Sequence, residues 1–182
     1  MKKIAVLFLA ASCLLLTACT SDTSRQVSAD AVKAQNKVNF KLPANQRWAL
    51  VSLEQDANGY AKSYRSVSAK GLSADQSFYI NYGHNIKTPL DKSMKEVVSS
   101  LASTGCTNTT SKIEKSTANM LIFTASADHC TAGRPVSQVF KVFNMADGQY
   151  SIVYSANPNA VSNKIRQQMK DVVLKSSITT VG

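Results

Sequence analysis

The residues with the clearest capacity for chemistry are four cysteines, Cys13, Cys19, Cys106 and Cys130. A thiol can bind a metal, attack a substrate, carry a lipid or form a disulfide, and its surroundings decide between these roles. A structural zinc site needs about four ligands, whereas this sequence has two histidines and no Cys-x-x-Cys pair. We therefore expect no metal site and no bound cofactor.

Groups of side chains that act together in hydrolases are also missing from the sequence. Asp128 and His129 are adjacent, but neighbouring residues of a strand point to opposite faces and cannot orient each other as catalytic partners do. There is no Gly-x-Ser-x-Gly turn, no Gly-rich phosphate loop and no carboxylate pair at helical spacing on an apolar face. Because each of these patterns marks a common class of enzyme, we expect a protein that is not an enzyme.

Basic residues outnumber acidic ones by 21 to 11, which gives a net charge of +10. The densest basic set lies in the last predicted helix, where Asp171 is the only opposing charge. On a helix this set falls opposite the apolar stripe, so it forms either a solvated outer face or a contact with anionic lipid head groups or an acidic partner protein. The set consists of Lys164, Arg166, Lys170 and Lys175.

The N-terminus has the pattern of an export signal. Lys2 and Lys3 precede an almost unbroken apolar run over residues 4–16, and small residues follow it, as is typical of a secretory signal peptide. The run is too short to span a bilayer, which takes about 20 apolar residues. Its end, Leu16-Thr17-Ala18-Cys19, resembles the lipobox of bacterial lipoproteins. The alternative is an ordinary cleaved secretory protein with a stray cysteine.

In bacterial lipoproteins the cysteine becomes the first residue of the mature chain and carries acyl chains such as palmitate. The resemblance therefore implies a signal peptide over residues 1–18 and a membrane anchor at Cys19, since two or more acyl chains hold a protein stably on a bilayer. Thr20 and Ser21 follow the anchor, without the Asp that commonly retains lipoproteins at the inner membrane. The resemblance thus implies the periplasmic leaflet of the outer membrane rather than the inner membrane.

Export leaves two cysteines for the folded part, because Cys13 is lost with the signal and Cys19 carries the lipid. In an oxidising periplasm Cys106 and Cys130 most simply form one disulfide. Such a bridge closes a loop of about 25 residues and stabilises the fold by roughly 3.5 kcal/mol on chain-entropy grounds. Export also removes nucleic acid as a natural partner of the positive charge, so we expect the membrane and other envelope proteins as partners.

The mature chain divides into a tether and one folded domain. Residues 19–41 are rich in Ser, Asp, Ala, Gln and Lys, and a coil of this length averages about 25–30 Å from end to end. A short amphipathic helix within the tether is the alternative. Residues 42–182 form the predicted periplasmic domain.

Hairpins and two helices are predicted within this domain. Two β-prone runs flank Asn58-Gly59, which is a typical hairpin turn, and residues 77–82 alternate as a third strand. Thr88-Pro89 predicts a helix start with Thr88 as the cap, and Gly105 predicts its end. Two further hairpins follow, and a second helix is predicted to open near Asn157-Pro158.

Hairpin-connected strands separated by helices predict an α+β domain, in which two helices pack on an antiparallel, meandering sheet. The order of elements over residues 38–178 resembles the PsbP-like lipoproteins, in which a short segment such as Phe40-Lys41-Leu42-Pro43 leads into the sheet. In that group one helix crosses the sheet and a last hairpin feeds a C-terminal helix. Its members are mostly non-enzymatic accessory or assembly factors, so the resemblance implies such a role.

We expect from these features an outer-membrane-anchored periplasmic lipoprotein that acts as an accessory or scaffold subunit of an envelope assembly, such as a secretion system. The alternative is a binding module for a small ligand, peptidoglycan or a lytic enzyme. A deep, partly apolar cavity would favour the binding module. An exposed edge strand or apolar patch would favour assembly.

The lipid anchor can be tested by replacing Cys19. The Cys19→Ala protein should leave the membrane fraction and lack the mass of the acyl chains, because no thiol remains to be acylated. Cell fractionation and mass spectrometry measure both effects, and Cys13→Ala is the control because that residue lies inside the signal. Unchanged membrane association of the Cys19→Ala protein would show that the lipoprotein prediction is wrong.

Overall fold

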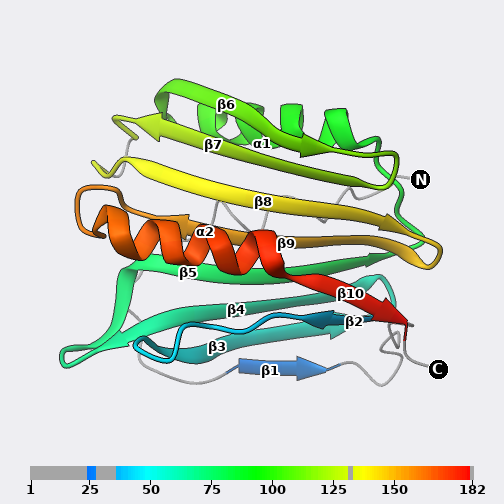
Figure 1. Cartoon of the computed structure of the whole chain (residues 1–182), viewed down its shortest axis with the longest axis horizontal. Coiled ribbons are helices and arrows are strands. Elements are labelled where there is room, and N and C mark those ends of the chain that lie inside the picture. The colour runs from blue at the N-terminus through cyan, green and yellow to red at the C-terminus, as the bar shows by residue number, and fades with distance from the viewer. Residues whose placement is uncertain (1–23, 28–35, 131–132, 181–182) are drawn as a thin grey trace.

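The computed structural model describes residues 24–27, 36–130 and 133–180. These residues form a large sheet, a small sheet and two helices (Figure 1). The elements are β1 (Ser24–Val27), β2 (Asn36–Asn39), β3 (Arg47–Asp56), β4 (Gly59–Ser68), β5 (Gly71–His84), α1 (Leu90–Ser103), β6 (Thr107–Ser116), β7 (Met120–Asp128), β8 (Val136–Met145), β9 (Gly148–Ala156), α2 (Asn163–Lys175) and β10 (Ser177–Thr180).

The large sheet consists of two antiparallel meanders that meet in its middle. Strands β3, β4 and β5 form the first meander, and β6, β7, β8 and β9 form the second. They are joined where β5 pairs with β9, so the strand order is β1-β3-β4-β5-β9-β8-β7-β6. Strand β1 adds in parallel to the edge strand β3, and β10 pairs with β2 in the small sheet.

The predicted α+β class, an antiparallel meandering sheet with two packed helices, is wrong. Strands make up 56% of the structure, and the helices are minor elements of 14 and 13 residues. The strands are longer than the sequence pattern indicates: β5 begins at Gly71, six residues before the alternating run over 77–82. Its first part pairs with the end of β4 only and carries just two apolar residues, Leu72 and Ala74, of which Leu72 is 47% exposed, so its strand signal is weak.

The predicted hairpin at Asn58-Gly59 is confirmed. Strands β3 and β4 are paired as far as the turn, where Asp56 lies opposite Gly59. The Asp56 carboxylate accepts hydrogen bonds from the backbone N–H groups of Asn58 and Gly59 at 2.7 and 3.1 Å. Gly59 has a φ of +149°, and a Cβ atom there would lie 1.9 Å from the Tyr82 carbonyl oxygen. Only glycine fits this turn, because it crosses so close to the end of β5.

The predicted Thr88 cap of α1 is not formed. The cap position is Pro89, and no side chain caps the helix. The Thr88 carbonyl instead accepts hydrogen bonds from the side-chain amides of Asn144 and Gln149, at 3.2 and 2.9 Å. The segment before α1 is thus held by residues on either side of the β8–β9 turn, which lie 56 and 61 residues further along the chain.

The second helix begins later than the sequence pattern indicates. Asn157 lies in a turn, where its carbonyl accepts from the N–H groups of Ala160 and Val161. The helix starts at Asn163, and the Ser162 hydroxyl caps it by accepting from the Ile165 N–H. A serine at this position is a common helix cap.

The two helices cover opposite faces of the large sheet. On one face α2 lies over β8 and β9 and packs on aromatic and aliphatic side chains. On the other face α1 lies over β6 and β7, as the two ribbons in Figure 1 show. In the α2 core, Met169 of the helix packs with the sheet residues Phe78, Ile80, Ile152 and Tyr154. In the α1 core, Val97 of the helix packs with the sheet residues Leu121, Phe123, Phe140 and Val153.

A buried lysine holds the C-terminal end of α2. Lys141 on β8 is 6% exposed, and its ammonium group donates to the carbonyl oxygens of Leu174 and Ser176 at 2.8 and 2.6 Å. The last carbonyls of a helix lack partners within the helix and attract a cation. Burial lowers the pKa of Lys141, with a smaller contribution from the charge of Lys115.

A buried polar network closes the end of the sheet where β5 finishes and β9 begins. Asp147 accepts from the Tyr150 hydroxyl at 2.6 Å and from the Asn36 side-chain amide at 2.7 Å. The Tyr82 hydroxyl donates to the Asp147 carbonyl oxygen at 3.1 Å, and its ring stacks on Tyr150. Burial raises the pKa of both Tyr60 and Tyr82 to about 12, and the Asp147 charge adds to each shift.

Unfolding in alkali should report this burial. All six tyrosines have a pKa raised above 10.0 by burial. Above pH 10 the unfolded chain therefore binds fewer protons than the native one, and stability falls as the pH rises. We expect the free energy of unfolding in urea to decrease from pH 10 to about 12. The raised pKa of Tyr82 makes it one source of this slope, so Tyr82→Phe should flatten it. A constant free energy of unfolding over this range would contradict the prediction.

Candidate functional site

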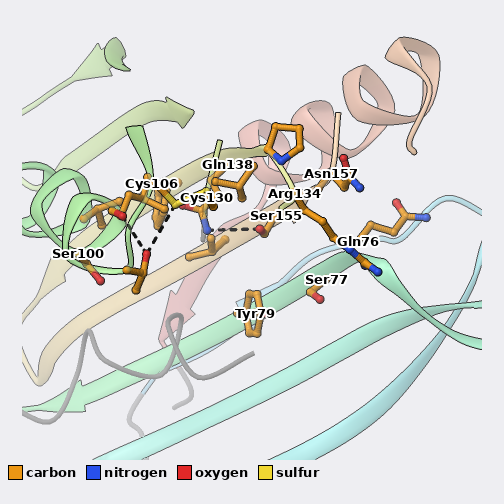
Figure 2. Close-up of a pocket in the computed structure, with 18 of the residues that line it drawn as sticks. Gln76, Ser77, Tyr79, Ser100, Cys106, Cys130, Arg134, Gln138, Ser155 and Asn157 are labelled. Atoms are coloured by element: carbon orange, nitrogen blue, oxygen red, sulfur yellow. Dashed lines mark hydrogen bonds between the residues drawn. A yellow bond between two sulfur atoms is a disulfide. The ribbon is translucent and has the colours of Figure 1, made fainter. Parts of the chain in front are cut away.

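A cavity of about 200 Å³ opens on the α1 face of the sheet. Its floor is formed by β5, β9 and β8, and its walls by the last turns of α1, the Cys106–Cys130 bridge and the segment that leads into β8. Figure 2 shows Ser77 and Tyr79 of β5 across from Gln138 and Ser155. The cavity lies where α1, which covers β6 and β7, leaves the middle of the sheet without a helix.

Strand register places an apolar row across the middle of the floor. Tyr79 lies opposite Val153, and Val153 lies opposite Phe140. Val97 and Leu101 of α1 form the facing wall. Burial raises the pKa of Tyr79, against smaller opposing effects of the Ser77 hydroxyl and the Arg65 charge. The phenol is therefore neutral at ordinary pH.

Polar side chains flank this apolar row on both sides. On one side of the row, two residues along each strand, the Gln138 side-chain amide donates to the Ser155 hydroxyl at 3.3 Å. On the other side, at the same spacing, the Asn81 side-chain amide donates to the Ser151 hydroxyl at 3.2 Å. Each pair joins neighbouring strands, so backbone register and side-chain hydrogen bonds together fix these groups in position.

The charges at the cavity mouth compensate each other. The Arg134 guanidinium lies 3.5 Å from the Asp75 carboxylate, and both side chains are partly exposed, at 54% and 38%. Asp75 also accepts from the Asn157 side-chain amide at 3.4 Å. Among the described lining residues these are the only charged ones, so the cavity interior carries no net charge.

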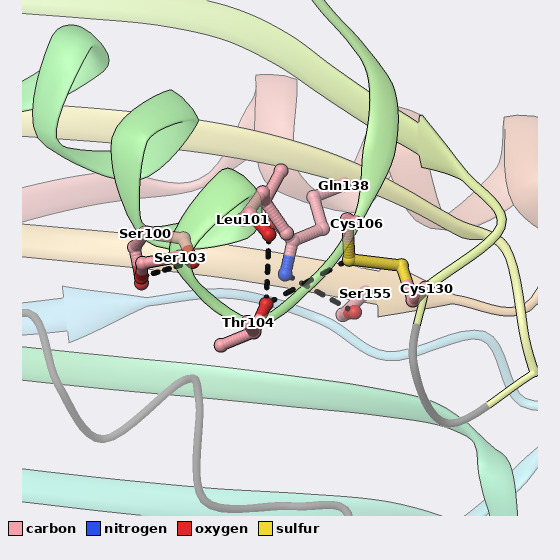
Figure 3. The surroundings of a disulfide bond; sticks show 8 residues. All are labelled: Ser100, Leu101, Ser103, Thr104, Cys106, Cys130, Gln138 and Ser155. Atoms are coloured by element: carbon pink, nitrogen blue, oxygen red, sulfur yellow. Dashed lines mark hydrogen bonds between the residues drawn. A yellow bond between two sulfur atoms is a disulfide. The ribbon is translucent and has the colours of Figure 1, made fainter.

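The disulfide forms part of the cavity wall, and Figure 3 shows it close to Thr104, Gln138 and Ser155. The predicted pair is present: the sulfur atoms of Cys106 and Cys130 lie 2.12 Å apart. Cys106 lies three residues beyond Ser103, the last residue of α1, and the Thr104 hydroxyl between them donates to the Leu101 carbonyl at 2.8 Å. Cys130 follows the end of β7. The bridge therefore ties the end of the helix to the sheet beside the Gln138–Ser155 pair.

The four predicted basic residues of the last helix have different surroundings. Lys164 and Lys175 are exposed. Lys170 lies 3.0 Å from the Glu114 carboxylate on β6 and lowers the pKa of that group, and Arg166 donates to the Val161 carbonyl. Two of the four cations are thus engaged within the domain, and a membrane or partner face formed by all four stays a prediction.

Other predicted features lie partly or wholly outside the described residues. Cys19 and the signal peptide over residues 1–18 are among these. Strands β1 and β2 fall within the predicted tether 19–41, and each is paired with a strand of the domain. In the described residues no group of three or more His, Cys, Asp and Glu could hold a metal. Neither helix described is long and apolar enough to cross a membrane.

The sequence pattern alone did not reveal the cavity. Its floor joins the predicted β8–β9 hairpin to β5, and the pairing of β5 with β9 cannot be read from the linear sequence. One signal was present: Ser77, Tyr79 and Asn81 alternate as polar, aromatic and polar on one face of β5. Ser151, Val153 and Ser155 repeat this order on β9. A sheet face on which polar side chains flank an apolar row is suited to contact a ligand as well as a hydrophobic core.

The bridge beside the cavity predicts a measurable effect on stability. Reduction should expose the Cys106 and Cys130 thiols and lower the free energy of unfolding by roughly 3.5 kcal/mol. Thiol titration and urea unfolding with and without reductant measure both effects. The doubly substituted Cys106→Ser, Cys130→Ser protein is the control and should not respond to reductant. Free thiols in untreated, denatured material would contradict the bridge.

No protein-family model matches this chain, and no curated protein or solved structure shows significant similarity to it. Function therefore has to be argued from the site itself.

Proposed function

We propose that this chain is a lipid-anchored periplasmic binding module whose cavity takes a small molecule. The observation that carries the proposal is the cavity on the α1 face, with its apolar floor and flanking polar pairs. Binding sites for small molecules are concave and mostly apolar, with a few polar groups that fix orientation. This cavity has each of these properties.

The size of the cavity limits what it can hold. Its volume of about 200 Å³ lies below the usual range of about 300–1,000 Å³ for drug-sized ligands. At the packing density of protein interiors, roughly 0.75, it accommodates about ten non-hydrogen atoms. A peptidoglycan strand or a lytic enzyme could insert no more than one terminal group or side chain.

The lining supports binding rather than catalysis. Among the described lining residues there is no histidine, and the only carboxylate, Asp75, is engaged with Arg134. The hydroxyl groups of Ser77, Ser151 and Ser155 therefore have no general base beside them, which a serine nucleophile requires. We accordingly propose a protein that is not an enzyme.

The proposed location rests on the N-terminal pattern and is compatible with the bridge. The lipobox at residues 16–19 would anchor Cys19 in a membrane, and Thr20 and Ser21, which lack the retaining Asp, would direct it to the outer membrane. A disulfide persists in an oxidising compartment such as the periplasm. A module held there by lipid would meet small molecules that enter the cell envelope.

An accessory or scaffold role in an envelope assembly, such as a secretion system, is the second candidate. Strand β6 favours it, because this edge strand is exposed at nine of its ten residues and Ile113 is 49% exposed. However, its register is interrupted twice and it carries Lys112 and Lys115. Such irregularities and charges are devices that keep edge strands from pairing with other chains. The cavity is therefore the stronger observation.

The binding role can be tested by filling the cavity. Val153 is buried in the floor, so Val153→Phe should abolish binding of neutral and charged fragments of about ten non-hydrogen atoms. Saturation-transfer NMR with the mature protein in lipid nanodiscs measures binding, and empty nanodiscs correct for partition into lipid. Val67→Phe is the matched control, since Val67 lies on β4 outside the cavity lining.

A second filling variant keeps the test decisive if Val153→Phe fails to fold. Ser155→Leu occupies the neighbouring part of the floor, and circular dichroism verifies the fold of each variant. Fragments that bind the wild type and both folded filling variants equally would show that the cavity is not the binding site. Absence of any fragment bound to the wild-type cavity would likewise overturn the proposed function.

A further inference from the structure

Polar and apolar side chains alternate across the cavity floor, and this arrangement restricts the chemistry of its ligand. The apolar row of Tyr79, Val153 and Phe140 has the Gln138–Ser155 pair on one side and the Asn81–Ser151 pair on the other. Residues two apart on a strand are about 7 Å apart. A molecule of about ten non-hydrogen atoms can therefore lie on the apolar row and reach one polar pair.

Of the two polar pairs, Gln138–Ser155 is the better placed to bind the polar group of a ligand. Gln138 is 6% exposed, and the pair lies beside the disulfide wall and the end of α1, as Figures 2 and 3 show. A hydroxyl that accepts one hydrogen bond can still donate one, and an amide oxygen accepts two. Ser155 and Gln138 can together donate to a ligand and accept from it.

The absence of net charge in the lining bears on the charge of the ligand. Arg134 and Asp75 neutralise each other at the partly exposed mouth, and the other described lining residues are uncharged. Burying an ion without an opposite charge costs far more than burying a neutral polar group that is hydrogen-bonded. An anion or cation on the floor would have no partner there among the described residues.

We infer that the ligand is an uncharged molecule with an aromatic or branched aliphatic body and a primary amide or hydroxyl group. Its body lies on the Tyr79–Val153–Phe140 row, and its polar group exchanges hydrogen bonds with Gln138 and Ser155. This inference rests on the proposed binding role of the cavity, and it adds the chemical class of the ligand.

Benzamide, benzoate and benzylammonium test the charge, because they share one ring and differ in little else. Their dissociation constants are measured by NMR titration of the mature protein in nanodiscs at pH 7, with empty nanodiscs as the blank. Benzamide should bind at least tenfold more tightly than either ion. Equal or tighter binding of benzoate or benzylammonium would overturn the ligand class.

The role of the polar pair is tested with benzamide and toluene. Gln138→Leu should weaken benzamide binding by roughly five- to tenfold, the value of one or two hydrogen bonds, and leave toluene binding unchanged. Gln167→Leu is the matched control and should change neither, because Gln167 is exposed on α2 and does not line the cavity. A Gln138→Leu protein that binds both probes more weakly by the same factor would show a merely structural role for Gln138.

Further outcomes separate this inference from the proposed function. Should Gln138→Leu not fold, Ser155→Ala removes the same hydrogen-bonding site at smaller structural cost. If benzamide does not bind while other fragments occupy the cavity, the ligand class is wrong and the binding role stands. If no fragment occupies the wild-type cavity, the proposed function fails and this inference fails with it.

Discussion

The pairing of β5 with β9 is the constraint on which the rest of the structure depends. It joins two meanders that are otherwise separate, in unbroken register from Gln76 opposite Ala156 to His84 opposite Gly148. A slip by one residue would turn every side chain of one strand to the other face. Both cores, the cavity floor and the Asp147 network would then be lost together, because each contains residues of both strands or of the turns that end them.

The same register gives the two faces of the sheet their different characters. On the α2 face, alternate residues such as Phe78, Ile80 and Tyr154 are apolar or aromatic and form a continuous core. On the α1 face, the residues between them alternate between polar and apolar. An apolar helix face laid here would bury the Gln138–Ser155 and Asn81–Ser151 pairs and leave their remaining donors and acceptors without partners, which is costly. Helix α1 covers β6 and β7 instead, where Leu121 and Phe123 offer it an apolar surface.

Local features of the sequence were predictable, whereas features made by distant pairing were not. The Asn58-Gly59 turn and the Cys106–Cys130 bridge follow from residue types and their positions alone. The Thr88 cap failed because α1 begins at Leu90, so that Pro89 takes the cap position. The Thr88 carbonyl is held by Gln149, which lies 61 residues further along the chain. The α+β class failed because paired but polar strand segments have no periodic signal. The cavity could not be predicted, since its rows exist only once β5, β9 and β8 lie side by side.

The disulfide has one effect on stability and another on shape, and both follow from where the chain leaves α1. The helix ends at Ser103, and Gly105, with a φ of +77°, turns the chain away. Cys106 then fixes that turn to the end of β7 through Cys130. A cross-link of this kind stabilises a fold mainly by restricting the unfolded chain. Because both cysteines also line the cavity, the same bond fixes the position of one cavity wall relative to the end of β7. The bond that stabilises the fold therefore also sets part of the shape of the cavity, and the proposed selectivity for a neutral ligand depends on the polar pairs of the floor.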